Sequence, residues 1–357
     1  MHFYESSIIT TKDGLHCQVY ANEHPTHSIL VKPKYIPTDK VESSALQYRF
    51  IGGKKMNRLD LWTEKNALQT YVEQFKKAYP HYVMQSNMHN GSRLFFSVPI
   101  EHIERVYFPR TGLKELMSMP IDALDAHLRN VHEFVMLLTK SGLRMKDFGV
   151  TYSTLMGHYM SNISDINIVV YGKENFWKLM EFLEDAEHPM LRWKTREEWL
   201  DFYGRRNRHK IGDKEKFLKI MERKRSEGFF GNTLFVIFAA EKEEERTSTW
   251  DSERYVDEGI AKVTGIVSDA FNSAVRPGFY TIEKSEVITG KNVPVSQIFF
   301  HSRDYCMLAR PGEKIEACGT LERVEPKQGE PYYRIVIGYL DSYITERREQ
   351  EYVKNHM

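Results

Sequence analysis

The secondary structure that the sequence predicts changes in character twice along the chain, and this change constrains the fold more than any other feature. Residues 8–11, 15–20 and 28–35 are short runs rich in β-branched and aromatic residues, which predicts strands. Strand and helix patterns alternate between residues 149 and 240, and short strand patterns return from residue 262 onward. The sequence therefore predicts an α+β protein of several domains, with an α/β unit between two β-rich units.

The length and composition exclude a membrane-spanning protein. The 357 residues suffice for two or three domains of about 150 residues each. The longest apolar runs, such as residues 234–240, are far shorter than the roughly 20 residues that a spanning helix needs. The three cysteines include no C-x-x-C pair, and the first residues do not resemble a signal peptide. We therefore expect a cytoplasmic protein that does not contact a membrane.

Changes in pattern and charge predict the domain boundaries. A helix is expected to begin at Pro120, whose fixed backbone angle suits a first helical turn. Residues 241–258 contain eight acidic and three basic residues, which is typical of a linker. The predicted segments are an N-terminal α+β domain (1–119), a central α/β domain (120–245), a C-terminal β-barrel (259–340) and a charged tail (341–357).

Two segments of the central domain carry the residues that best indicate chemistry. Residues 149–157 are expected to form a strand and then a turn that contains Ser153, and residues 165–171 a second strand. Side chains alternate between the faces of a strand, so Asp165 and Asn167 are expected on the same side, about 7 Å apart. Two oxygen-bearing side chains at a strand start suit a hard cation such as Mg²⁺, whose other positions bind water and phosphate.

These segments resemble the signature of the DNA polymerase beta-like nucleotidyltransferase superfamily, in which a Gly-Ser turn precedes an Asp-x-Asp strand. The similarity is closer to a family of archaeal predicted nucleotidyltransferases, and it extends to residues 11–15, 222–228 and 311–321. The resemblance implies a nucleotidyltransferase-like fold in which Mg²⁺ ions bind a nucleoside triphosphate. It also implies that Asp165 is a metal ligand and that Ser153 contacts the phosphates.

Two residues depart from the family pattern. Tyr152 replaces the Gly of the turn, although Gly permits backbone conformations and a close approach to phosphate that Tyr does not. Asn167 replaces the second Asp and is a neutral metal ligand at best. At ~4 Å, the loss of one charge removes about 1 kcal/mol of attraction per cation charge in water, and about 4 kcal/mol at an effective dielectric constant near 20. We therefore expect impaired or lost transfer activity.

A third carboxylate normally comes from a later strand in this superfamily. Glu241 follows the predicted strand at residues 234–240 and completes a predicted catalytic group with Asp165 and Asn167. Each assignment has a structural alternative. Glu241 is otherwise the start of the acidic linker, Asp165 a turn-capping residue and Ser153 a helix N-cap, and Asn167 is otherwise a structural hydrogen-bonding residue.

A local excess of positive charge suggests contacts with phosphate. The chain has a formal net charge of +1, but residues 192–225 contain 13 basic and six acidic residues. Arg205, Arg206 and Lys224 are candidate nucleotide-binding residues in this segment, which also contains aromatic residues able to stack on bases. The alternative is a pair of amphipathic helices with solvated basic faces.

The predicted C-terminal strands resemble an OB-fold, a barrel that often binds oligonucleotides. Residues 263–267 and 316–321 each place a Gly within a strand pattern, as bent barrel strands do. Arg276, Tyr280 and Arg303 are candidate contacts with RNA or DNA, and the alternative is a β-domain used for packing. Two hypotheses follow: an Mg²⁺-dependent nucleotide-binding protein related to nucleotidyltransferases, or a non-catalytic nucleic-acid-binding or scaffold protein on the same fold.

Overall fold

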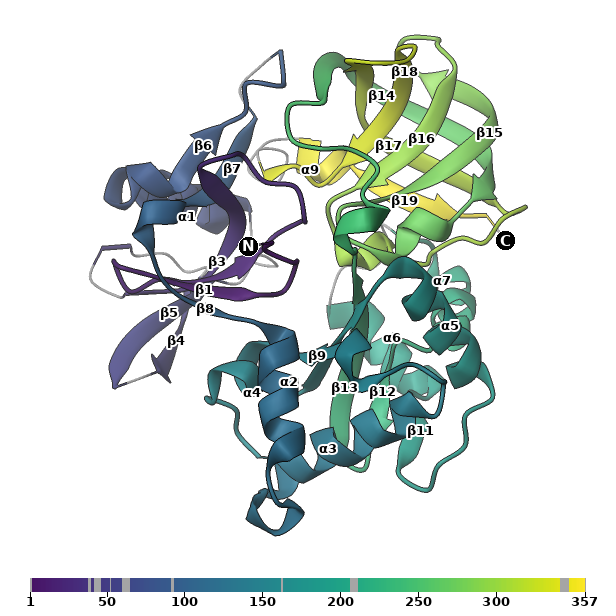
Figure 1. Cartoon of the computed structure of the whole chain (residues 1–357). Coiled ribbons are helices and arrows are strands. Elements are labelled where there is room, and N and C mark those ends of the chain that lie inside the picture. The colour runs from purple at the N-terminus through teal and green to yellow at the C-terminus, as the bar shows by residue number, and fades with distance from the viewer. Residues whose placement is uncertain are drawn as a thin grey trace.

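The computed structural model describes residues 2–37, 40–41, 46–51, 53–59, 65–90, 93–161, 163–205, 211–340 and 347–356. These residues form three sheets, one in each third of the chain, and most of the helices belong to the middle third (Figure 1). This mixed α+β architecture agrees with the prediction. Within the described residues, every helix is too short or too polar to traverse a lipid bilayer.

The N-terminal unit is an antiparallel sheet covered by one helix. Its strands are β1 (Ile8–Thr11), β2 (His16–Val19), β3 (Ser28–Pro37), β4 (Leu46–Ile51), β5 (Lys54–Leu59), β6 (Val83–Gln85), β7 (Leu94–Pro99) and β8 (Ile103–Tyr107). The strand order is β4-β5-β3-β2-β1-β8, and β7 pairs with both β3 and β6. Helix α1 (Lys65–Ala78) buries Leu68, Tyr71 and Phe75 against the sheet, because these residues share one helical face.

The central unit combines helices with a mixed sheet. Its elements are α2 (Pro109–Ser118), α3 (Ala126–Thr139), β9 (Phe148–Val150), α4 (Tyr152–Met156), β10 (Ile166–Tyr171), α5 (Lys173–Glu184), β11 (Leu191–Trp193), α6 (Arg196–Arg205), α7 (Lys214–Arg223), β12 (Glu227–Phe230) and β13 (Thr233–Ala240). The strand order is β11-β12-β13-β10-β9, and β10 runs parallel to β13. Pro120 does not begin the long helix as predicted. Helix α3 begins later because the Asp125 carboxylate accepts a hydrogen bond from the Leu128 amide and caps it.

The C-terminal unit is a sheet that closes on itself. Its elements are β14 (Glu253–Asp269), β15 (Gly278–Thr289), β16 (Val295–Phe300), β17 (Lys314–Pro326), β18 (Tyr332–Ile337), α9 (Arg347–Gln350) and β19 (Tyr352–Asn355). The strand order is β14-β15-β16-β18-β17, and β14 also pairs with β17, so five strands form a ring. The predicted linker is partly wrong, because β14 begins at Glu253. The predicted tail is also partly wrong, because β19 pairs with β17.

Short 3-10 helices connect several of these elements: η1 (Pro80–Tyr82), η2 (Ile100–His102), η3 (Ile121–Ala123), η4 (Met145–Asp147), η6 (Glu243–Glu245), η7 (Phe271–Ala274) and η8 (Arg303–Tyr305).

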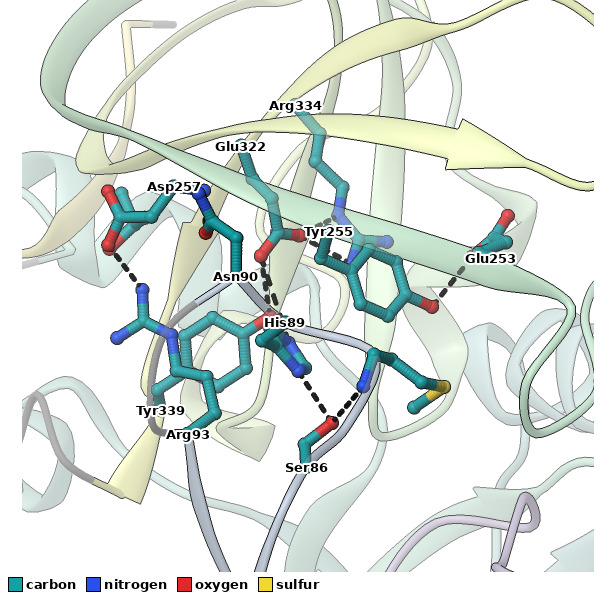
Figure 2. Close-up of polar contacts among 12 residues, drawn as sticks. Ser86, His89, Asn90, Arg93, Glu253, Tyr255, Asp257, Glu322, Arg334 and Tyr339 are labelled. Carbon is teal, nitrogen blue, oxygen red and sulfur yellow. Dashed lines mark hydrogen bonds and ion pairs between the residues drawn. The ribbon is translucent and has the colours of Figure 1, made fainter.

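The loop between β6 and β7 joins the N-terminal unit to the outside of the ring (Figure 2). The amide of Tyr255 donates to the carbonyl of Met88 at 2.8 Å, and the amide of Asn90 donates to the carbonyl of Tyr255 at 3.0 Å. His89 lies between the Ser86 hydroxyl at 2.7 Å and the Tyr339 hydroxyl at 3.0 Å. Burial lowers the pKa of His89 to about 3, so its imidazole is neutral.

Ion pairs complete this contact, which we call the ring junction. Arg93 pairs with Asp257 at 2.8 Å, and Arg334 pairs with Glu322 at 2.7 Å (Figure 2). Glu322 is 1% exposed and also accepts a hydrogen bond from the Tyr339 hydroxyl at 3.0 Å. Each of these cations therefore faces a carboxylate.

Candidate functional site

Tyr152, in the turn after β9, has a backbone conformation that is typical of glycine. Tyr152 begins α4 with φ of +56°, in the left-handed region that glycine adopts freely and that costs other residues roughly 1–2 kcal/mol. Its ring lies under Lys34, whose Nζ is 3.5 Å from the ring centroid. Its hydroxyl accepts a hydrogen bond from Arg303 at 2.9 Å. The tyrosine therefore connects β3 of the N-terminal unit with η8 of the C-terminal unit.

The start of β10 defines one face of the central sheet. Asp165 directly precedes β10, and the parallel register places Asn167 beside Val236 of β13. Val169 lies beside Phe238 on the same side two residues later. We call this surface the Asp165 face. The amide group of Asn167 donates to the backbone carbonyl of Asp165 at 3.2 Å, so part of this side chain has the structural role considered above.

Glu241 does not join this group. Ala240 is in register with Tyr171, the last residue of β10, so Glu241 follows at the opposite end of the strand pair, about 20 Å from Asp165. Its carboxylate accepts a hydrogen bond from the buried ammonium of Lys173 at 2.7 Å. Burial raises the pKa of Glu241, and the Lys173 charge opposes this shift. The residue proposed as the third carboxylate therefore neutralises a buried lysine instead.

Arginines from the C-terminal unit converge on the Asp165 face. The guanidinium carbon of Arg303 lies 3.6 Å from the centroid of the Phe238 ring, and Arg303 pairs with Glu5 at 2.6 Å. Arg276 pairs with the same Glu5 carboxylate, which is 2% exposed. One buried carboxylate therefore faces two arginines, and positive charge exceeds negative charge at this position.

Two lysines of β3 add to this charge. Burial, together with Arg276 and Arg303, lowers the pKa of Lys32 to about 7, although Glu5 and Asp304 oppose this shift. Burial, Arg58 and Arg303 also hold the pKa of Lys34 well below its usual value, although Asp165 opposes this shift. Among the residues that the structure describes, no carboxylate lies within 4.0 Å of either ammonium group. Keeping both ammonium groups charged in this buried position is unfavourable, and a bound anion would stabilise the charged forms by supplying negative charge.

A cavity of about 200 Å³ lies beside the Asp165 face, between β13, the helices α6 and α7, and the C-terminal unit. Its lining includes apolar, aromatic, cationic and acidic side chains: Val236, Phe238, Trp199, Phe202, Lys224, Arg276, Arg303, Glu227 and Asp304. The volume is below the roughly 300–1,000 Å³ of typical small-molecule pockets, so a nucleotide would be only partly enclosed. The cavity can offer a base an aromatic wall and a phosphate several cations.

The chain has an archaeal relative. It is 28% identical over 352 residues to an uncharacterized protein of Methanocaldococcus jannaschii, and the alignment covers 97% of each chain. No family model matches the chain, and a search of the solved structures found no significant match.

The other predicted nucleotide-binding residues differ in their placement. Ser153 is the second residue of α4 and is not its N-cap, since Thr151 occupies that position. Lys224 lines the cavity. Arg205 is the last residue of α6, and Arg206 lies outside the described residues. Lys224 is thus the member of this predicted set that the structure brings to the cavity.

The predicted nucleic-acid contacts do not form an exposed surface. Tyr280 is fully buried inside the ring, where its hydroxyl donates to the carbonyl of Tyr305 and accepts from the amide of Leu308, both at 2.7 Å. A ring held in this way cannot stack on a base, so this assignment is corrected. Arg276 and Arg303 point to the junction with Glu5 instead of to solvent.

Lys32 and Lys34 are the site residues that sequence reasoning missed. They alternate with buried residues in β3, and that pattern was a weak signal for cations on a covered strand face. Nothing local predicted that Lys34 contacts the turn after β9, because β3 and β9 belong to different sheets.

Proposed function

We propose that this protein binds a nucleoside polyphosphate at the Asp165 face and does not transfer its nucleotidyl group. The observation that carries the proposal is the pair of lysines, Lys32 and Lys34, which lie half-buried beside Arg303 with no carboxylate partner among the described residues. Charge-assisted hydrogen bonds to phosphate oxygens are roughly twice as strong as neutral ones. A polyphosphate therefore suits this group of cations better than a neutral ligand does.

The proposal includes the finer fold assignments. The order β9, α4, β10, with β13 parallel to β10, supports a nucleotidyltransferase-like central unit, since it puts a turn and an acidic strand start side by side. The strand order of the ring and the parallel pairing of β16 with β18 support an OB-like barrel.

Mg²⁺ would bind together with the nucleotide. Asp165 offers one carboxylate, and Mg²⁺ commonly uses one or two carboxylates with phosphate oxygens and water. Transfer by two metal ions needs carboxylates that hold both ions. Asn167 and Val236 are neutral, and β13 contains no acidic residue between Thr233 and Ala240. The residues of this face therefore favour binding over transfer.

The test is a calorimetric titration of the full chain with ATP, with and without Mg²⁺. We expect Mg²⁺ to strengthen ATP binding in the wild type and to have a much smaller effect in Asp165→Ala. We also expect no Asp165-dependent release of pyrophosphate in the presence of RNA. ATP binding that is identical in both proteins would contradict the binding site, and Asp165-dependent pyrophosphate release would contradict the loss of transfer.

The substitution Asn167→Asp examines the metal position separately. A second carboxylate on the same strand face should increase the affinity for Mg²⁺ in the ATP complex, because it adds a full charge next to Asp165. Calorimetry that shows the same Mg²⁺ dependence in both proteins would indicate that this strand start is not an ion site.

The ring topology favours a second candidate, the binding of single-stranded RNA or DNA. Such binding would weaken steeply with salt and would not depend on Asp165. We rank it lower because the ring junction covers part of the outer ring surface and Tyr280 is buried.

A further inference from the structure

Three turns of the N-terminal unit bring together side chains that can bind a metal ion. Asp13 lies in the tight turn between β1 and β2, His81 lies in η1, and His102 lies in η2. The Asp13 Oδ2 atom is 3.1 Å from Nε2 of His81 and 3.8 Å from Nδ1 of His102. All three ligand atoms lie within 4.8 Å of one another. These residues are far apart in sequence, so only the fold creates the group.

The spacing suits a tetrahedral zinc ion. Zinc binds histidine nitrogen at about 2.0–2.1 Å and carboxylate oxygen at about 2.0–2.2 Å, so two ligand atoms of one ion lie about 3.4 Å apart. The observed distances of 3.1 and 3.8 Å lie on either side of this value. Small side-chain rotations would therefore be sufficient to bind the ion.

Surrounding contacts hold the ligands in place. The hydroxyl of Tyr82, a buried residue, donates to Oδ2 of Asp13 at 2.5 Å. The backbone amide of Lys12 donates to the carbonyl of His102 at 3.0 Å, which ties the β1–β2 turn to η2. A hydrogen bond to a ligating side chain, such as the one from Tyr82, orients the ligand and commonly contributes a further tenfold or more to metal affinity.

We propose that Asp13, His81 and His102 bind a divalent transition-metal ion, with Zn²⁺ as the expected metal. The three side chains are 34%, 37% and 35% exposed, so a water molecule can reach a fourth position. Two imidazoles and one carboxylate suit Zn²⁺, whereas Mg²⁺ and Ca²⁺ prefer oxygen ligands alone. The site belongs to the N-terminal unit and does not depend on the proposed nucleotide site.

The test is a titration of metal-free full-length protein with Zn²⁺ against a coloured chelator, and with Co²⁺ followed by its visible absorption. We expect one Zn²⁺ per chain, and a dissociation constant at least about tenfold higher in Asp13→Asn and in His102→Ala. Tyr82→Phe should retain all three ligands and weaken binding by about tenfold. Lys34→Met should leave Zn²⁺ binding unchanged, which separates this proposal from the nucleotide site.

His27→Ala is the matched control, because His27 is an exposed histidine of the same unit. It should bind Zn²⁺ as the wild type does. The proposal is overturned if the double variant His81→Ala, His102→Ala binds Zn²⁺ as tightly as the wild type, or if His27→Ala weakens binding to the same extent as His102→Ala.

Discussion

Two of the contacts between the N-terminal unit and the rest of the molecule differ in charge balance. At the ring junction, Arg93 and Arg334 each face a carboxylate at 2.8 and 2.7 Å (Figure 2). At the Asp165 face, Lys32 and Lys34 have no such partner among the described residues. Both contacts bury charged groups between units. At the Asp165 face, Glu5 pairs with both arginines there, but no carboxylate among the described residues pairs with the two lysines.

The difference agrees with a structural role for the ring junction and with the ligand proposed for the Asp165 face. An isolated buried charge is costly, and its pKa shifts toward the neutral form. Removing one member of a buried pair leaves such a charge behind, so a paired contact is expected to be sensitive to mutation. Two lysines without a carboxylate partner among the described residues lower the stability of the ligand-free protein, and a bound anion would supply the opposite charge.

The largest expected effect is at the ring junction. Glu322→Ala leaves Arg334 buried without its partner and should lower the free energy of unfolding by about 3–5 kcal/mol. Urea denaturation measures this change. Glu325→Ala is the control, since Glu325 pairs with Arg323 near the surface and should contribute about 1 kcal/mol or less. Equal losses of unfolding free energy in the two variants would show that the buried pair is no more sensitive to mutation than a surface pair.

Lys34→Met should weaken ATP binding but leave the stability of the protein nearly unchanged. Without a ligand, its free energy of unfolding should stay within about 1 kcal/mol of the wild type or increase, because the substitution removes a poorly solvated charge. The affinity for ATP should fall by roughly ten- to a hundredfold, from the loss of a charged hydrogen bond worth about 1.5–3 kcal/mol. Lys314→Met, at an exposed lysine of β17, should change neither quantity. A loss of stability with unchanged ATP affinity would assign Lys34 a structural role.

The pH dependence of ATP binding tests Lys32. Its pKa of about 7 means that the ammonium form declines above neutral pH, so affinity should decrease by about tenfold between pH 6 and pH 8. Binding near pH 7.5 should take up a proton, which calorimetry in buffers of different ionisation enthalpy detects. The ligand-free protein should instead become more stable from about pH 7 toward 10.5, because the unfolded chain binds more protons there. An affinity for ATP that does not change between pH 6 and pH 8 would exclude Lys32 from the site.

The smallest expected effect concerns the backbone of Tyr152. Tyr152→Gly and Tyr152→Ala both remove the ring that contacts Lys34 and Arg303. Glycine tolerates the φ of +56°, so the glycine variant should be about 1 kcal/mol more stable than the alanine variant. The reverse order in thermal denaturation would show that the positive φ is not retained in solution.

Local patterns predicted much of the secondary structure. The strand predicted at residues 165–171 is β10, because periodicity is a property of neighbouring residues. The linker and tail predictions were partly wrong at β14 and β19. The start of β14 is rich in charged residues and β19 has only four residues, and both strands pair with a distant segment, β17.

The sequence by itself determined that Asp165 and Asn167 lie at the start of one strand on one side, since strand alternation is local. Only the tertiary structure decided that Glu241 lies at the opposite end of the strand pair, because that depends on the register between β10 and β13. The tertiary structure also decided that Lys34 lies over Tyr152, through the packing of separate units. Contacts between distant segments depend on how sheets pack together, and no short-range pattern in a single sequence records that.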